Sequence, residues 1–232
     1  MNTKDQIKEN IKKIFSVADG KAQVLAATKT VPAELINYAA DCGITLIGEN
    51  RVNELLQKYD EIDKSRLTIH FIGALQTNKV KYIIDKVSMI QSLDRMSLAQ
   101  EIEKQAAKHG IVMPVLVEIN IGREESKSGV MPENAIDLCT KILEFPHISL
   151  EGLMAVPPKC ENSDENRKYF SKMREIFIDI SDKIVDNSIN MKKFRILSMG
   201  MSGDYETAVD CGSNMIRVGS AVFGKRDYGN KK

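Results

Sequence analysis

Short apolar runs alternate with helical segments along the whole chain, and this alternation restricts the fold more than any other feature. Each run is bounded by turn residues and is followed by a segment whose apolar residues recur at helical spacing. Strands separated by helices pair in parallel, and runs that are apolar on both faces are typical of a sheet covered on both sides. We expect eight strands, near residues 24–28, 44–47, 67–72, 87–93, 115–120, 150–156, 194–199 and 215–218.

Eight strand–helix units in 232 residues predict an α/β fold, a single (β/α)8 or TIM barrel that takes up residues 1–232 as one domain. An additional N-terminal helix is expected at 4–18, where Ile7, Ile11 and Ile14 share one face, and it would plug or flank the far end of the barrel. A doubly wound open sheet is the alternative. It is less favoured because no G-x-G-x-x-G motif follows the first strand.

Charge and composition exclude several classes of protein. The sequence contains 33 basic and 32 acidic residues, mixed along the chain, which predicts no surface for nucleic acid or for an anionic membrane. No apolar run approaches the roughly 18 residues of a membrane-spanning helix, and residues 1–20 lack the apolar core of a secretory signal. The cysteines lie far apart without a C-x-x-C pair, so neither a metal site nor a disulfide framework is predicted. These features favour a cytoplasmic protein with reduced thiols.

Lys29 follows the first expected strand directly, and Thr30 and Pro32 then turn the chain. Barrel enzymes and binding proteins place their chemistry at this carboxyl end of the strands. A lysine amine in that position can attack a carbonyl group and form a Schiff base. The strand by itself favours a simpler interpretation, in which the stem of Lys29 lies on apolar surface and its amine reaches solvent. The loops after other strands, at the same end of the barrel, help to distinguish a reactive lysine from a solvated one.

The loops after the seventh and eighth strands contain glycine and serine, in Gly200-Met201-Ser202-Gly203 and in Gly219-Ser220. Barrels commonly bind phosphate with these two loops, through backbone N–H groups and hydroxyls. Helix capping would explain either loop alone, but both loops together predict a phosphate site. Arg217 lies on the same face of the eighth strand as Gly219 and should be buried with a partner. A lysine, a phosphate site and an arginine between them match the needs of pyridoxal phosphate.

Several long stretches along the chain form recognisable motifs: LAATKT at 25–30, GENRVNE at 48–54, HFIGALQTNK at 70–79, QSLDR at 91–95, INIGREESKSG at 119–129, EGLMAVPP at 151–158, LSMGMSGD at 197–204 and IRVGSAVFGKRDY at 216–228. In these stretches the chain resembles the pyridoxal phosphate homeostasis proteins, which are relatives of the barrel domain of bacterial alanine racemase. The resemblance implies that Lys29 forms the Schiff base and that Ser202, Gly219 and Ser220 hold the phosphate. It further implies that Arg217 faces the pyridine nitrogen. Asn50, after the second strand, is an additional expected contact.

What the resemblance implies about function is storage and supply of the cofactor without turnover of a substrate. Arg217 supports this expectation, because a guanidinium donates to the ring nitrogen and disfavours its protonation, which leaves a weak electron sink. Alanine racemase adds a tyrosine base from a second domain. Here Tyr205 and Tyr228 are expected to pack or cap instead. We expect a monomer that is not an enzyme and whose partners are pyridoxal phosphate and apo-enzymes that accept it.

Two other functions remain open at this point. One is a stand-alone pyridoxal-phosphate-dependent amino-acid racemase, and the other is a lyase that forms its Schiff base with a phosphorylated carbonyl substrate. Glu118 should need a partner if it is buried in the fifth strand, and Lys127 and Arg217 are candidates. Lys79, Arg123 and Lys127 would form a second ligand surface, although solvated loop charges are the commoner explanation. The polar loop 122–129 could move and gate access.

Overall fold

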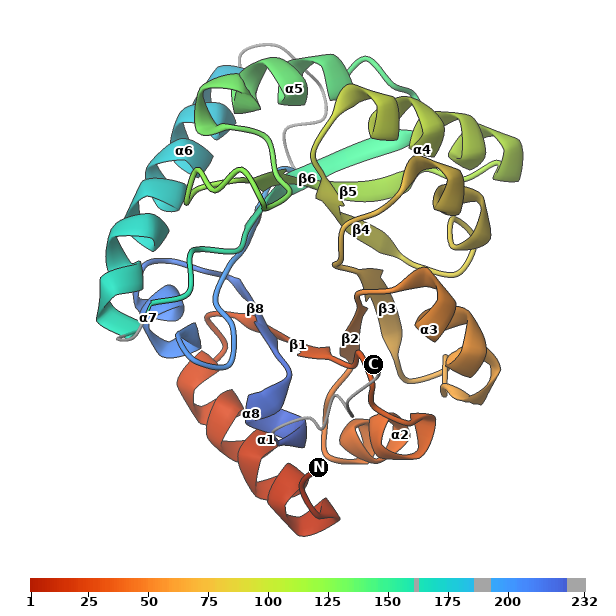
Figure 1. The fold of residues 1–232 in the computed structure, drawn as a ribbon, viewed down its shortest axis with the longest axis vertical. Coiled ribbons are helices and arrows are strands. Elements are labelled where there is room, and N and C mark those ends of the chain that lie inside the picture. Colours follow the sequence, from red (N-terminus) through yellow and green to blue (C-terminus); the bar gives the residue numbers. More distant parts are fainter. Residues whose placement is uncertain (161–162, 186–192, 225–232) are drawn as a thin grey trace.

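Eight parallel strands close into a barrel in sequence order, with β8 paired to β1 (Figure 1). The computed structural model of the chain describes residues 1–160, 163–185 and 193–224. The strands are β1 (Gln23–Ala27), β2 (Leu46–Glu49), β3 (Thr68–Phe71), β4 (Met89–Leu93), β5 (Met113–Ile119), β6 (Ile148–Ala155), β7 (Ile196–Ser198) and β8 (Met215–Val218). The predicted (β/α)8 barrel is therefore confirmed.

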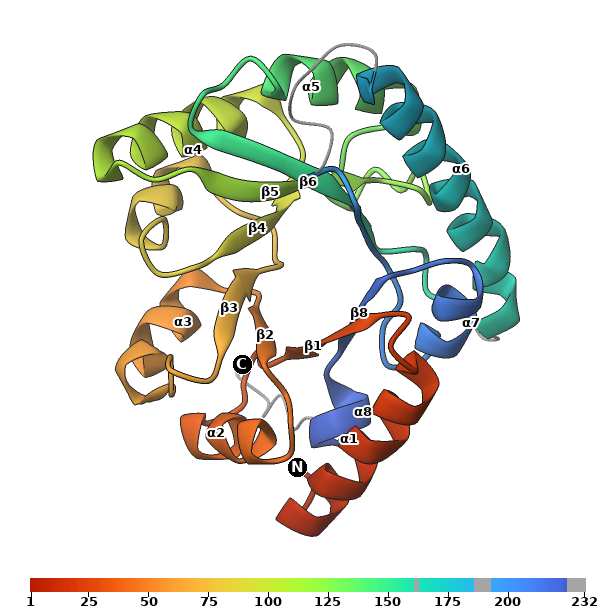
Figure 2. The same ribbon diagram turned by 180° about the vertical axis from the view of Figure 1, so that it is seen from behind.

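The helices surround this ring of strands, as the two opposite views show (Figures 1 and 2). They are α1 (Lys4–Ala18), α2 (Ala33–Asp41), α3 (Val52–Lys58), α4 (Met96–His109), α5 (Ala135–Ile142), α6 (Arg167–Val185), α7 (Tyr205–Asp210) and α8 (Ser220–Phe223). Short 3-10 helices occupy Tyr59–Glu61, Thr77–Tyr82, Pro132–Asn134 and Ser163–Asn166. In the described part of the chain, no helix is long and apolar enough to cross a lipid bilayer.

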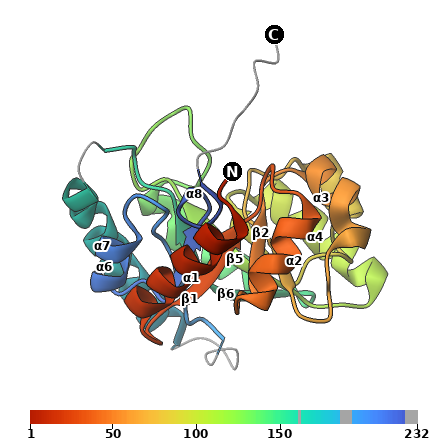
Figure 3. The ribbon, with the colours of Figure 1, turned by 90° about the horizontal axis from the view of Figure 1, so that it is seen from below.

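The first helix lies against the side of the barrel and does not plug its end. Thr3 and Gln6 begin α1 with a capping box, and Ile7, Ile11 and Ile14 are buried on its inner face. Figure 3 shows α1 beside α2 and α8, both of which it contacts. Of the two placements expected from the sequence, flanking is the one that the structure shows.

The N-terminal segment also joins the beginning of the described chain to its last helix. The backbone N–H of Asn2 donates to the carbonyl of Phe223 at 2.8 Å, and its side chain donates to the carbonyl of Val222 at 3.1 Å. Asn10 in α1 donates to the same carbonyl of Val222 at 3.2 Å. These bonds hold α8, a helix of four residues, in place on the barrel.

The alternation of side chains along β1 separates the barrel interior from the layer beneath the helices. Leu25 lies inside the barrel in a cluster with Leu46 and Met215, while Val24 and Ala26 belong to the larger core between strands and helices. A second interior cluster contains Met89, Leu116 and Met154. Continuing the same alternation past Leu25 directs Lys29 toward the interior at the carboxyl end of the strands.

Candidate functional site

A cavity of about 790 Å³ opens at the carboxyl end of the barrel and brings most of the predicted residues together. Five of the six candidates line it: Lys29, Ser202, Arg217, Gly219 and Ser220. Asn50 is not among the residues that line this cavity. It follows β2 directly, and its side-chain oxygen is buried without a hydrogen bond to any residue that the structure describes.

Lys29 lies two residues past the last residue of β1, Ala27, which also lines the cavity. Its side chain is partly buried, and its amine forms no hydrogen bond or ion pair with the described residues. A lysine that is held at a cavity wall without a carboxylate partner keeps its amine accessible to an electrophile in the cavity.

The turn that follows Lys29 is held by α3. Thr30 has φ of 60°, which is a rare backbone conformation for a β-branched residue. Its N–H donates to Oε2 of Glu54 at 3.0 Å. The amine of Lys58 donates to the carbonyls of Thr28 at 2.7 Å and Val31 at 3.2 Å, on either side of the turn. Two residues of one helix therefore fix the backbone around Lys29.

Lys58 is itself paired with a carboxylate that is fully buried. Its amine lies 2.7 Å from Oε1 of Glu49, and the hydroxyl of Thr28 donates to the same oxygen. Burial raises the pKa of Glu49, and the charge of Lys58 opposes this effect. The sequence offered one signal for this cluster, an acid two residues after the apolar run 44–47, but no spacing rule connects that acid to Lys58.

The two glycine- and serine-containing loops meet at the hydroxyl of Ser202. Its oxygen accepts the backbone N–H groups of Gly219 and Ala221, each at 3.0 Å. The loop before it needs glycine at position 200, where φ is 92° and an added Cβ would lie 2.5 Å from Cβ of Ala208. Because the Ser202 oxygen accepts both N–H groups, its hydroxyl can donate its own proton, and with the hydroxyl of Ser220 beside it this junction fits a phosphate oxygen in the cavity.

Arg217 lies inside the barrel, with 4% of its surface exposed. It donates through Nη1 to the hydroxyl of Ser198 at 2.7 Å and through Nη2 to the carbonyl of Ala155 at 2.9 Å. Burial lowers the pKa of Arg217 to about 10, so its guanidinium stays charged at neutral pH. Its hydrogen-bond partners are thus neutral oxygens, and it holds a positive charge at the cavity wall.

Glu118 shares the inward face of β5 with Leu116 and is 6% exposed. Among the described residues, its Oε1 accepts only from the hydroxyl of Ser128, at 3.4 Å, and its Oε2 accepts from none. Neither Lys127 nor Arg217, the partners considered from the sequence, forms an ion pair with it. Burial, and then the charge of Asp94, raises the pKa of Glu118 to about 7.

The structure places the other residues considered from the sequence in different surroundings. Lys127 lines the cavity, where it pairs with Glu124 at 2.5 Å. Arg123 pairs with Glu133 at 2.8 Å, and the amine of Lys79 lies 5.6 Å from the ring centre of Tyr82. Tyr205 is buried in α7, while Tyr228 lies outside the described residues.

Comparison with known proteins places this architecture in a defined class. Residues 3–227 match the family described as "Alanine racemase, N-terminal domain". An alanine racemase from Clostridium difficile has the same fold, with a TM-score of 0.74 at 16% identity over 97% of this chain and 61% of that chain.

Two further comparisons are more specific. The pyridoxal phosphate homeostasis protein of Aquifex aeolicus is 45% identical over 211 residues, which are 89% of this chain and 88% of that protein. The solved structure of PipY from Synechococcus elongatus with pyridoxal phosphate bound has a TM-score of 0.85 at 27% identity, over 94% of this chain and 100% of that chain. The chain belongs to the pyridoxal phosphate homeostasis protein family, within the larger alanine racemase N-terminal domain family.

Proposed function

We propose that this protein binds pyridoxal phosphate through a Schiff base on Lys29. The observation that carries the proposal is the position of Lys29, whose amine shares one cavity with the N–H donors at Ser202 and with Arg217. Binding of pyridoxal phosphate by the related PipY supports the choice of ligand.

The proposal gives a role to each of the five candidate residues that line the cavity. Ser202, Gly219 and Ser220 would hold the phosphate, and Arg217 would donate to the pyridine nitrogen. Asn50 remains a predicted contact outside the cavity lining. When bound, the cofactor supplies an electrophilic aldehyde and an electron-withdrawing ring. Arg217 limits the second property, because its charged guanidinium donates to the ring nitrogen and does not protonate it.

We further propose that the protein stores the cofactor and supplies it to apo-enzymes, without strong catalysis of its own. In this proposal it is a single-domain monomer of the cytoplasm. A Schiff base is reversible, so a reactive aldehyde would stay masked on Lys29 until another amine takes it over. The name shared by the related proteins, which refers to homeostasis of the cofactor, supports a role in supply.

The linkage to Lys29 has a direct spectroscopic test. Wild-type protein loaded with pyridoxal phosphate should absorb at the edge of the visible range, and Lys29→Ala should lose this absorption. Borohydride should fix the cofactor on one lysine, identified by mass mapping. Lys127→Ala is the matched control, since Lys127 lines the same cavity. Modification of a lysine other than Lys29 in the wild type would refute the assignment.

Exchange of the α-proton separates storage from catalysis. A racemase would incorporate solvent deuterium at the α-carbon of an amino acid in a reaction that requires Lys29. We expect no such incorporation above the level of free pyridoxal phosphate. Incorporation that is lost in Lys29→Ala would establish the enzyme instead, and a colourless protein that cleaves a phosphorylated carbonyl substrate would establish the lyase.

The phosphate site is tested by comparing two ligands that differ only in the phosphate. Ser202→Ala should weaken binding of pyridoxal phosphate about tenfold, the effect of losing one hydrogen bond to a charged group. Binding of pyridoxal, which has no phosphate, should not change. Equal losses for both ligands would place the phosphate away from Ser202.

A further inference from the structure

Four buried side chains form a continuous chain of hydrogen bonds through the barrel interior, from Arg217 to His70. Nη1 of Arg217 donates to the hydroxyl of Ser198 at 2.7 Å, and this hydroxyl donates to Oε1 of Gln91 at 2.7 Å. Nε2 of Gln91 lies 2.9 Å from Nδ1 of His70. The least buried member, His70, is 6% exposed. The four residues come from β8, β7, β4 and β3, so the chain crosses the barrel.

The chemistry of its members gives this chain one direction. A guanidinium can only donate, so the oxygen of Ser198 accepts from it and the hydroxyl proton points to Gln91. The carbonyl oxygen of Gln91 accepts that proton, which turns its amide nitrogen toward His70. An amide nitrogen can only donate, so Nδ1 of His70 accepts and the ring carries its proton on Nε2. Each residue therefore fixes the orientation of the next.

The surroundings of the chain are mostly apolar, which makes each of its bonds costly to lose. The acids whose charges act on Arg217 are Glu118, on the inward face of β5, and Asp204. The interior clusters around the chain contain Met89, Leu116 and Met154 on one side and Leu25, Leu46 and Met215 on the other. A buried polar group without a partner is strongly unfavourable in such surroundings, whereas a complete network rigidifies the residues that form it. The bond to Ser198 and the bond to the carbonyl of Ala155 hold two guanidinium nitrogens, and so set the plane of the Arg217 group.

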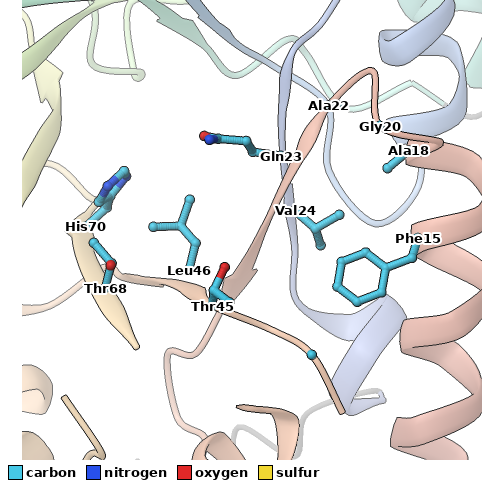
Figure 4. Close-up of a pocket in the computed structure, with 11 residues that line it drawn as sticks. Phe15, Ala18, Gly20, Ala22, Gln23, Val24, Thr45, Leu46, Thr68 and His70 are labelled. Atoms are coloured by element: carbon cyan, nitrogen blue, oxygen red, sulfur yellow. The ribbon is translucent and has the colours of Figure 1, made fainter. Parts of the chain in front are cut away.

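The far end of the chain reaches a second cavity, at the amino ends of β1, β2 and β3. This cavity has a volume of about 520 Å³, and His70 and Gln23 extend toward each other there on either side of Leu46 (Figure 4). No described residue forms a hydrogen bond with Nε2 of His70. Burial lowers the pKa of His70 to about 4, so the ring is neutral at physiological pH and its Nδ1 remains an acceptor.

We propose that Gln91 and His70 are positioning residues for Arg217, and that they act through Ser198 to set the orientation of its guanidinium against the ring nitrogen of pyridoxal phosphate. This inference rests on the proposed function. It extends the cofactor site to residues that do not line its cavity, on strands at the opposite side of the barrel.

A double-mutant cycle tests whether the effect passes along the chain. His70→Phe and Ser198→Ala are each expected to raise the dissociation constant of pyridoxal phosphate about three- to tenfold, and to shift the pH at which the bound cofactor changes its absorption. In the double variant, the His70 change should add nothing to the Ser198 change. Independent effects that multiply, or a His70→Phe protein with unchanged affinity and pH profile, would overturn the proposal.

Further variants separate positioning from simple packing. His70→Asn retains an acceptor, so it should keep most of the affinity for pyridoxal phosphate that His70→Phe loses. His109→Phe changes an exposed histidine of α4 and should have no effect on this affinity. If His70→Phe does not fold, Gln91→Met, which keeps the shape of the side chain, takes its place in the double-mutant cycle.

One measurement does not depend on the cofactor. Nitrogen chemical shifts of His70 in the protein without ligand should show the proton on Nε2, and a proton on Nδ1 would refute the chain. Failure of wild-type protein to bind pyridoxal phosphate would instead refute the proposed function. The two failures are therefore distinguishable.

Discussion

Replacing Lys58 by methionine is expected to lower the free energy of unfolding by about 3 kcal/mol at neutral pH. The amine of Lys58 lies 2.7 Å from Oε1 of Glu49, which is fully buried, and its removal leaves that carboxylate without a cation. Denaturant titration should show the loss as a lower midpoint. The loss should be smaller at pH 5 than at pH 8, because the pKa of Glu49 is already raised and the unpaired acid can take up a proton.

Two variants make this prediction specific to the ion pair. Lys64→Met removes an exposed lysine that also donates to backbone carbonyls, those of Tyr59 and Ile62, and it should change stability little. Adding Glu49→Gln to Lys58→Met should recover much of the loss, because the buried charge is then absent. Equal losses of stability in Lys58→Met and Lys64→Met would show that the ion pair of Lys58 with Glu49 stabilises the protein no more than the contacts of an exposed lysine do.

Replacing Glu118 by glutamine is expected to change how stability depends on pH. Burial raises the pKa of Glu118 from 4.5 to about 7, so between these values the folded protein retains a proton that the unfolded chain has lost. The unfolded state then binds fewer protons, and the stability of the wild type falls as pH rises through this window. The shift corresponds to about 3 kcal/mol, present below the window and lost above it.

Glutamine has no proton to lose, so the Glu118→Gln protein should not show this fall. Relative to the wild type, it should gain about 3 kcal/mol between pH 4.5 and pH 7.5 in denaturant titrations. Glu144→Gln, at an exposed glutamate, is the control and should follow the wild-type curve. Parallel curves for the wild type and Glu118→Gln would show that Glu118 ionises normally in the folded protein.

The strands could be predicted because a parallel barrel buries both faces of each strand, which leaves continuous apolar runs in the sequence. The error at the second strand has a specific cause. The expected strand 44–47 stops short of Glu49, whereas β2 extends through it as Leu46–Glu49. A carboxylate normally faces solvent, and here it is buried. The cation that permits this burial is Lys58, and its contact depends on how α3 folds back over β2.

The clustering of the candidate residues in one cavity could be predicted because they follow neighbouring strands, whose ends a barrel brings to one face. The residues behind that cavity could not. The contacts of Arg217 with Ser198 and Ala155, and of Gln91 with His70, depend on which positions of different strands face each other across the interior. Which positions face each other follows from the stagger of the strands in the closed sheet, and no local pattern in the sequence indicates it. The short helix α8 could not be predicted either, because residues 221–223 are only a short apolar run.

The hydrogen bonds between Asn2 and α8 have a consequence for how the binding site assembles. They join residues 220 and 221 positions apart, and contacts over such a separation carry the largest loop-closure cost during folding. We therefore expect Gly219 and Ala221, whose N–H groups hold Ser202, to reach their final positions only once β1 and β8 have met. A ligand held at this junction would bind the closed ring and not its open precursors, so its occupancy would report ring closure and would stabilise it by mass action.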